Sequence, residues 1–127
     1  VVAVTPAGER ALRRALPGDC PARLWSFPAD RAGRIPMREL MARLAGELEA
    51  LHVVCEGGGQ LAGALAREGL VDEYALIYSP SLLGDAAARP ALAGMDLPLS
   101  RRLVLRFTRA RRLGDDLLVL ARAAAGP

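Results

Sequence analysis

The sequence predicts an α/β fold, in which a mixed and mainly parallel sheet carries helices on both faces and ends in an antiparallel strand pair. Short apolar runs alternate along the chain with amphipathic segments, which is the pattern of repeated strand–helix–strand units. Such units join parallel strands through right-handed crossovers. The last two apolar runs are separated only by a short turn, which favours an antiparallel pair. The length of 127 residues and an apolar fraction of 52% indicate one domain over residues 1–127 with its own core.

The first half of the chain contains two predicted strands and two predicted helices. Residues 1–4 (VVAV) form a strand candidate, and residues 8–16 (GERALRRAL) have a helical pattern that PGDCP ends. Residues 22–27 (ARLWSF) give the second strand. The clearest helix spans residues 36–51 and has Pro36 at its first position. Its apolar residues recur on one face, namely Met37, Leu40, Met41, Leu44, Leu48 and Leu51.

The second half begins with a short β-branched run. Residues 52–55 (HVVC) do not alternate, which is typical of a strand buried on both faces. A helix follows over residues 59–68, and Gly69 with Leu70 behind it predicts a left-handed C-terminal cap. Residues 73–79 (EYALIYS) predict a strand that Pro80 ends. The final strand pair is predicted at residues 102–108 and 116–121, with Leu103, Leu105 and Phe107 sharing one face of the first strand.

Several side chains have structural interpretations. Trp25, Tyr74 and Tyr78 lie on predicted strands, so we expect them in the core, although Tyr78 is near the carboxyl end of its strand. Asp72 and Glu73 lie at a helix-to-strand junction, where we expect them to fix the turn.

Composition excludes several classes of function. Cys20 and Cys55 lie far apart without a CxxC motif, and His52 is the one histidine, so we expect no metal site. The sequence has no apolar run long enough for a membrane span and no signal-peptide pattern, and we expect a cytoplasmic protein that does not bind membranes. The net charge of +3 suits an anionic ligand without identifying one.

Three consecutive glycines between a predicted strand and a predicted helix form the main candidate site. Gly57, Gly58 and Gly59 follow the carboxyl end of the strand, where a helix N-terminus presents free N–H groups to an anion. Without Cβ atoms they allow a phosphate to approach the backbone closely. The GxGxxG and GxxxxGK[ST] spacings are absent, which disfavours a nucleoside triphosphatase. A tight turn that needs small residues for packing is the alternative, and it accounts for one or two of the glycines.

The segment VCEGGGQLAGALAREGLVDEYALIYSPSLLG, residues 54–84, resembles the reductase domain of the bacterial bifunctional pyrimidine deaminase/reductase of riboflavin biosynthesis. Its most specific parts are EGGGxLAxAL and GLVDE, and a weaker similarity runs along the whole chain. One departure is Ser81, where the family commonly has a lysine. The resemblance implies a dihydrofolate-reductase-like fold. Because the family's first strands precede the point that matches Val1, we expect an N-terminally incomplete domain.

The resemblance also implies an NADPH-dependent reduction of 5-amino-6-(5-phosphoribosylamino)uracil to its ribitylamino product. Gly57, Gly58, Gly59 and Gln60 would then hold the cofactor pyrophosphate, and Leu61 would begin the helix that supplies the dipole. No residue of this chain is assigned as the proton donor.

Two further residues carry a binding role in this interpretation and an ordinary structural role beside it. Thr5 lies where related proteins hold the adenosine 2′-phosphate, and it is equally suited to cap a helix or end a strand. Glu56 matches a substrate-binding glutamate of the family. Since its carboxylate would repel a pyrophosphate, we expect it to turn toward the substrate's ribose hydroxyls. Its alternative role is to cap N–H groups of the loop that it precedes.

The arginine-rich C-terminal strands raise the question of a nucleic-acid partner. No aromatic or helix–turn–helix pattern accompanies these arginines, so a solvent-exposed strand face or a homodimer contact is the preferred interpretation. Two alternatives to the riboflavin-pathway reductase stay open: a non-catalytic remnant that binds nucleotide or dimerises, and a related reductase with another substrate.

Overall fold

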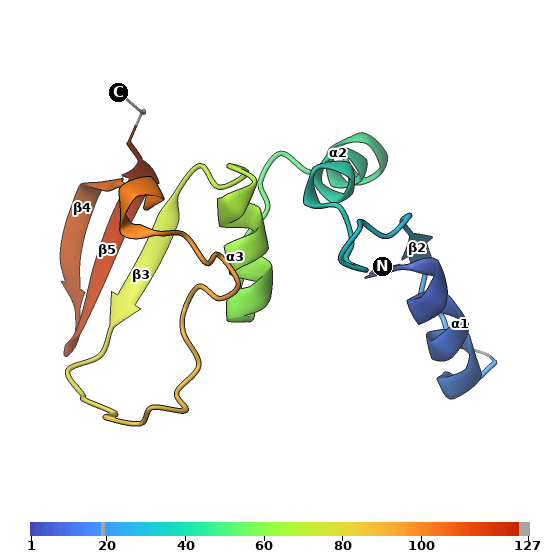
Figure 1. The fold of residues 1–127 in the computed structure, drawn as a ribbon, viewed down its shortest axis with the longest axis horizontal. Helices are drawn as coiled ribbons and strands as arrows, with labels where there is room; N and C mark the ends of the chain where they lie inside the picture. Colours follow the sequence, from blue (N-terminus) through green and yellow to red (C-terminus); the bar gives the residue numbers. More distant parts are fainter. Residues whose placement is uncertain (19, 125–127) are drawn as a thin grey trace. The chain divides into compact units, whose positions relative to one another are not determined.

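The computed structural model describes residues 1–18 and 20–124, which form two compact units (Figure 1). Unit 1 is Val1–Val54, and unit 2 begins at Cys55.

Unit 1 opens with a strand–helix–strand motif. Strand β1 (Val2–Val4) pairs in parallel with β2 (Leu24–Ser26), and helix α1 (Pro6–Ala15) connects them. The pairing continues past β2, since the Phe27 N–H donates to the Val4 carbonyl at 2.8 Å. Helix α1 begins at Pro6, two residues before the predicted start at Gly8, and it directly follows the capping residue Thr5.

The core of unit 1 gathers around Trp25, which is 1% exposed. Phe27 and Met37 are also buried, and the Trp25 and Phe27 rings meet edge to face with centroids 6.5 Å apart. Arg43 of helix α2 (Met37–Leu48) places its guanidinium carbon 4.7 Å from the centroid of the Trp25 ring. The burial predicted for Trp25 is therefore confirmed.

Helix α2 is shorter than its sequence pattern indicates. Pro36 is the N-cap rather than the first helical residue, and Glu49 ends the helix in the left-handed conformation with φ 52°. Leu51, predicted on the apolar face, lies past this stop and is 92% exposed. A periodic leucine pattern does not indicate the residue at which the helix ends.

The strand predicted at residues 52–55 is not formed. These residues are exposed and unpaired in the described structure, and the boundary between the two units falls among them. A strand exists only through hydrogen bonds to a neighbouring strand, and a run of β-branched residues does not identify that neighbour.

Unit 2 combines helix α3 (Gly59–Arg67) with a three-stranded antiparallel sheet (Figure 1). The strands β3 (Tyr74–Tyr78), β4 (Leu105–Leu113) and β5 (Asp116–Ala123) are arranged in the order β3-β5-β4. A short 3₁₀ helix, Leu99–Arg101, precedes β4. The β4–β5 hairpin turns at Gly114, whose φ of 63° is the conformation that such turns require.

The buried core of unit 2 is formed by Ala66 on α3, Tyr74 on β3 and Ala121 on β5. Partly buried hydrophobic residues pack against it: Val71, Leu76, Met95, Leu103 and Leu105. The burial predicted for Tyr74 is confirmed. The prediction for Tyr78 is wrong, since this residue ends β3 beyond the core and is 52% exposed.

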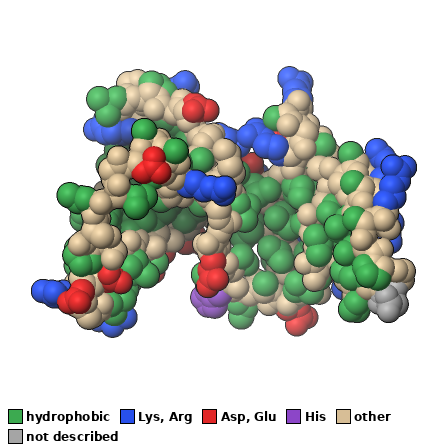
Figure 2. Space-filling model, turned by 90° about the horizontal axis from the view of Figure 1, so that it is seen from below, with side chains coloured by type: hydrophobic (Ala, Val, Ile, Leu, Met, Phe, Trp, Pro, Cys, Tyr) green, Lys and Arg blue, Asp and Glu red, His purple; other side chains and the backbone are tan. Residues whose placement is uncertain are grey.

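Strand β4 departs from its predicted face pattern and also contains a bulge. Its register with β5 shifts between Phe107 and Arg109, and Phe107 is 69% exposed although it alternates with the partly buried Leu103 and Leu105. The arginines of β4 are exposed, and hydrophobic side chains are visible on the surface beside arginines (Figure 2). A charged edge strand of this kind resists pairing with other chains.

The mixed α/β class predicted from the sequence is confirmed. The predicted mainly parallel pairing is wrong, because antiparallel pairing predominates among the described strands. Within residues 1–18 and 20–124, parallel pairing is confined to β1 and β2, and β3 adds a third antiparallel strand to the predicted C-terminal pair. The sequence pattern of β3 does not reveal this, because an apolar strand between a helix and a long loop has the same composition in either orientation.

Candidate functional site

The candidate site is the N-terminus of helix α3, where the three glycines enter the first turn. Gly58 is the N-cap and has φ 70°, a conformation that side chains adopt only with strain. Its carbonyl accepts hydrogen bonds from the N–H groups of Leu61 at 3.0 Å and Ala62 at 3.1 Å. Within the described residues, the structure gives the N–H groups of Gly59 and Gln60 no acceptor. These two donors remain available at the positive end of the helix dipole.

The side of Gly57 and Gly58 is open. A Cβ built on either residue would meet no atom within 4 Å. Glu56 and Cys55, just before them, are exposed as well. An anion can therefore approach the first turn of α3 from this side.

The other side of the first turn is covered by residues 90–94, which we call the strap. A Cβ on Gly59 would overlap the carbonyl oxygen of Pro90 and lie 3.4 Å from that of Ala91. One turn further along α3, a Cβ on Gly63 would overlap the carbonyl of Ala93. The strap backbone can lie this close only because both helical positions are glycine.

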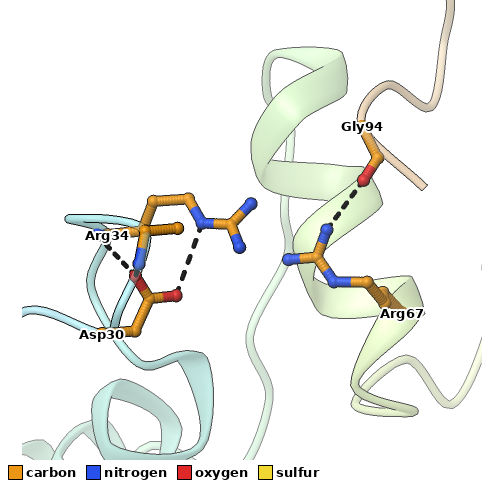
Figure 3. Close-up of polar contacts among 5 residues, drawn as sticks. Asp30, Arg34, Arg67 and Gly94 are labelled. Carbon is orange, nitrogen blue, oxygen red and sulfur yellow. Dashed lines mark hydrogen bonds and ion pairs between the residues drawn. The ribbon is translucent and has the colours of Figure 1, made fainter. Parts of the chain in front are cut away.

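The strap is also held by hydrogen bonds. The Ala93 N–H donates to the Gly59 carbonyl at 2.9 Å, and Nη1 of Arg67 donates to the Gly94 carbonyl at 2.7 Å. Figure 3 shows the Arg67 side chain reaching from the last turn of α3 to Gly94. The strap is thus fastened at both ends of the helix.

The C-terminus of α3 is closed in the way that the sequence predicts. Gly69 has φ 66°, its N–H donates to the Ala66 carbonyl at 3.1 Å, and the Leu70 N–H donates to the Leu65 carbonyl at 3.0 Å. These two bonds form a Schellman motif. The following junction carries an ion pair, in which Arg122 Nε lies 3.3 Å from Glu73 Oε2.

The structure brings six of the seven predicted site residues together. Helix α3 begins at Gly59, as the sequence pattern predicts, whereas the family resemblance implied a start at Leu61. The Leu61 N–H is already bonded within the first turn. The Gln60 side chain lies over Gly94, because a Cβ on Gly94 would be 2.8 Å from Gln60 Oε1. Gln60 therefore faces a possible anion with its backbone N–H and the strap with its side chain.

The seventh residue, Thr5, belongs to unit 1. Its hydroxyl accepts a hydrogen bond from the Gly8 N–H at 3.3 Å, so it caps α1. The structural role that the sequence left open for Thr5 is therefore present. Its role toward a 2′-phosphate stays a prediction.

The two interpretations of the glycines can now be separated residue by residue. Gly58 is explained by its positive φ, and Gly59 by the close approach of the strap. Gly57 has neither constraint, since its φ is not positive and a Cβ on it would meet no atom within 4 Å. The tight-turn alternative therefore explains why positions 58 and 59 are glycine. It does not explain Gly57, for which an anion site gives a reason.

The comparison with protein families decides where this chain belongs. The family model of the RibD C-terminal domain matches residues 4–119. The chain belongs to the RibD C-terminal domain family. This assignment agrees with the resemblance carried by the glycine motif and its following helix. A search of curated proteins gives no match.

Solved structures of RibD share the fold. "Acinetobacter baumannii RibD, form 2" superposes with a TM-score of 0.66 at 22% identity and covers 84% of this chain and 32% of its own. "Acinetobacter baumannii RibD, form 1" gives a TM-score of 0.66 at 22% identity, covering 80% and 31%. The chain thus spans about a third of the length of these RibD proteins. The likeness establishes the dihydrofolate-reductase-like fold of the chain.

Among the described residues, no three side chains of His, Cys, Asp or Glu are grouped so that they could bind a metal ion. No helix in residues 1–18 or 20–124 is long and apolar enough to cross a membrane.

Sequence reasoning missed the strap and its contacts. Residues 90–94 look like an ordinary Gly- and Pro-punctuated loop, and Arg67 looks like a solvent-exposed helical arginine. The one available signal is that Gly59 and Gly63 are four residues apart and so lie on the same face of α3.

Proposed function

We propose that this chain is the part of a riboflavin-pathway reductase that binds the phosphate groups of the cofactor. The parent protein would reduce 5-amino-6-(5-phosphoribosylamino)uracil with NADPH. Membership of the RibD C-terminal domain family supports the reductase class, and the first turn of α3 supports the phosphate role. The carrying observation is that a Cβ on Gly57 would meet no atom within 4 Å, while the N–H groups of Gly59 and Gln60 lack acceptors among the described residues.

The residues present fit a pyrophosphate. Two unpaired N–H donors at a helix N-terminus attract an anion, and the missing Cβ atoms of Gly57 and Gly58 leave room for its oxygens. Bound NADPH would supply a hydride to the sugar C1 of the substrate. The contribution of this chain would be to bind the cofactor and to hold it in a fixed orientation, which is where much of the rate of such reactions arises.

Glu56 is proposed as a substrate contact. It is exposed, and the described structure gives it no hydrogen-bond or ion-pair partner. A carboxylate in this position would accept hydrogen bonds from ribose hydroxyls. The expected homodimer also stays a proposal, and light scattering of the purified chain would test it.

The experiment compares Gly57→Asp with Gly57→Asn. Both side chains have the same shape, and Gly57 accommodates them without strain, whereas Gly58 has a positive φ. We expect the Asp variant to bind NADPH at least about tenfold more weakly than the Asn variant, because the carboxylate repels the pyrophosphate. Binding would be measured by nucleotide fluorescence. Equal affinities of the two variants would contradict a phosphate at this turn.

Activity requires a separate test on the full-length parent. Turnover of the ribosylaminouracil substrate with NADPH is the expected result. A parent that binds NADPH without turnover would favour the non-catalytic alternative, and turnover of a different substrate would favour a related reductase.

A further inference from the structure

The strap lies between a fully exposed loop and the core of unit 2. Residues 79–89 are all exposed, whereas Met95, just after the strap, packs against the core. Between them, residues 90–94 are fastened to α3 by the hydrogen bonds of Ala93 and Arg67. The strap is therefore the segment that fixes the end of this loop on the helix of the candidate site.

The strap also restricts the approach to the first turn of α3. The carbonyl oxygens of Pro90 and Ala91 face the Cβ direction of Gly59. Carbonyl oxygens carry partial negative charge, so they repel an anion on that side. The open side of Gly57 and Gly58 is left as the approach to the N–H groups of Gly59 and Gln60.

We propose that the strap is a positioning device for the bound nucleotide and that Arg67 is the positioning residue that holds it in place. This proposal rests on the proposed function of the glycine turn. Arg67 is eight residues after Gly59, which corresponds to about 12 Å along a helix. At that distance the effect of Arg67 on a phosphate at the first turn passes through Gly94 and the strap.

The test uses three variants of the chain. Arg67→Met removes the donor and keeps the apolar stem, and Arg67→Lys keeps a donor that can reach a carbonyl. Arg14→Met is the matched control, because Arg14 also lies in the last turn of a helix and has no hydrogen bond in the described structure. Arg67 is exposed, so we expect all three variants to fold.

The first measurement is amide hydrogen exchange at Ala93, whose N–H is bonded to the Gly59 carbonyl at 2.9 Å. Arg67→Met is expected to speed this exchange about five- to tenfold, the effect of losing one ordinary solvent-exposed hydrogen bond. Arg67→Lys should restore part of the protection, and Arg14→Met should leave it unchanged. Unchanged exchange in Arg67→Met would overturn the role of Arg67 as a clamp.

The second measurement is the affinity for NADPH and for NADH. A positioning role predicts that Arg67→Met weakens both nucleotides by the same factor, of about three- to tenfold, and that Arg67→Lys recovers part of it. Loss of NADPH affinity alone would overturn the proposal, because it would indicate direct contact with the 2′-phosphate. Unchanged affinities beside faster Ala93 exchange would also overturn it. If the wild-type chain binds neither nucleotide, the proposed function itself fails, and the exchange data still report whether Arg67 clamps the strap.

Discussion

The substitution Gly63→Ala tests the docking of the strap on α3 directly. Gly63 is buried in the middle of the helix, and its Cβ would lie well within 3.0 Å of the Ala93 carbonyl oxygen, a separation that real Cβ atoms essentially never show. The obstructing atom belongs to the backbone, so no side-chain rotation can relieve the overlap. The strap must shift by on the order of 1 Å, and the hydrogen bond from Ala93 to Gly59 is strained with it.

The expected change in the free energy of unfolding follows from three contributions. Alanine stabilises a helix interior by about 1 kcal/mol relative to glycine. Forcing a methyl group into a packed contact costs about 1–3 kcal/mol. Loss of one hydrogen bond costs about 1 kcal/mol. Gly63→Ala is therefore expected to destabilise the chain by about 1–3 kcal/mol.

Gly46→Ala is the matched control, because Gly46 is also helical and a Cβ there would meet nothing within 4 Å. It should stabilise the chain by up to about 1 kcal/mol. Urea denaturation followed by circular dichroism measures both changes. If Gly63→Ala stabilises the chain as Gly46→Ala does, the strap does not lie on α3 and the argument for its role is refuted.

Two further predictions concern pH. Burial raises the pKa of Tyr74, so the folded state holds the phenol proton more tightly than the unfolded state does. The stability that this contributes is present below about pH 10. It is lost as the pH rises through the raised pKa. Denaturation at several alkaline pH values should show this fall for the wild-type chain and a smaller one for Tyr74→Phe; identical slopes would contradict it. The Arg34 backbone N–H, which donates to Asp30 Oδ1 at 2.8 Å, lowers the pKa of Asp30, with a smaller contribution from the Ala32 N–H (Figure 3). This contribution to stability is present above the ordinary carboxyl pKa and lost as the pH falls through the lowered value. An NMR titration should therefore place the Asp30 midpoint below 3.8, and a midpoint at or above that value would contradict the hydrogen-bonded loop.

Helix α3 and its caps were the most predictable part of the fold. The start at Gly59 matches the predicted helix, and the left-handed Gly69 with its Schellman bonds follows from the Gly–Leu pair. These features depend on hydrogen bonds between residues at most five apart, so the information lies within a short stretch of sequence. The burial of Trp25 and Tyr74 was predicted from residue type and place on a strand, and the same reasoning was wrong for Tyr78, because a strand's own sequence does not show where the core ends.

The site was predicted as a set of residues, and its shape was not. The sequence identifies Gly57, Gly58, Gly59 and Gln60 as one turn, because they are consecutive. It does not show that Gly59 faces the strap or that the Gln60 side chain lies over Gly94. Both facts depend on a segment about thirty residues away in the chain.

The sequence by itself determined the family, the mixed α/β class, the C-terminal cap of α3 and the glycine turn, because each of these depends on local patterns or on a contiguous motif. Tertiary structure alone decided that residues 52–55 do not pair as a strand, that β3 runs antiparallel to β5, and that the Phe107 side chain is exposed. It also decided that the strap and Arg67 belong to the candidate site. The physical reason is that strand pairing and backbone contacts join N–H and C=O groups of segments that are distant in the sequence. A local sequence pattern does not identify which distant segment is the partner.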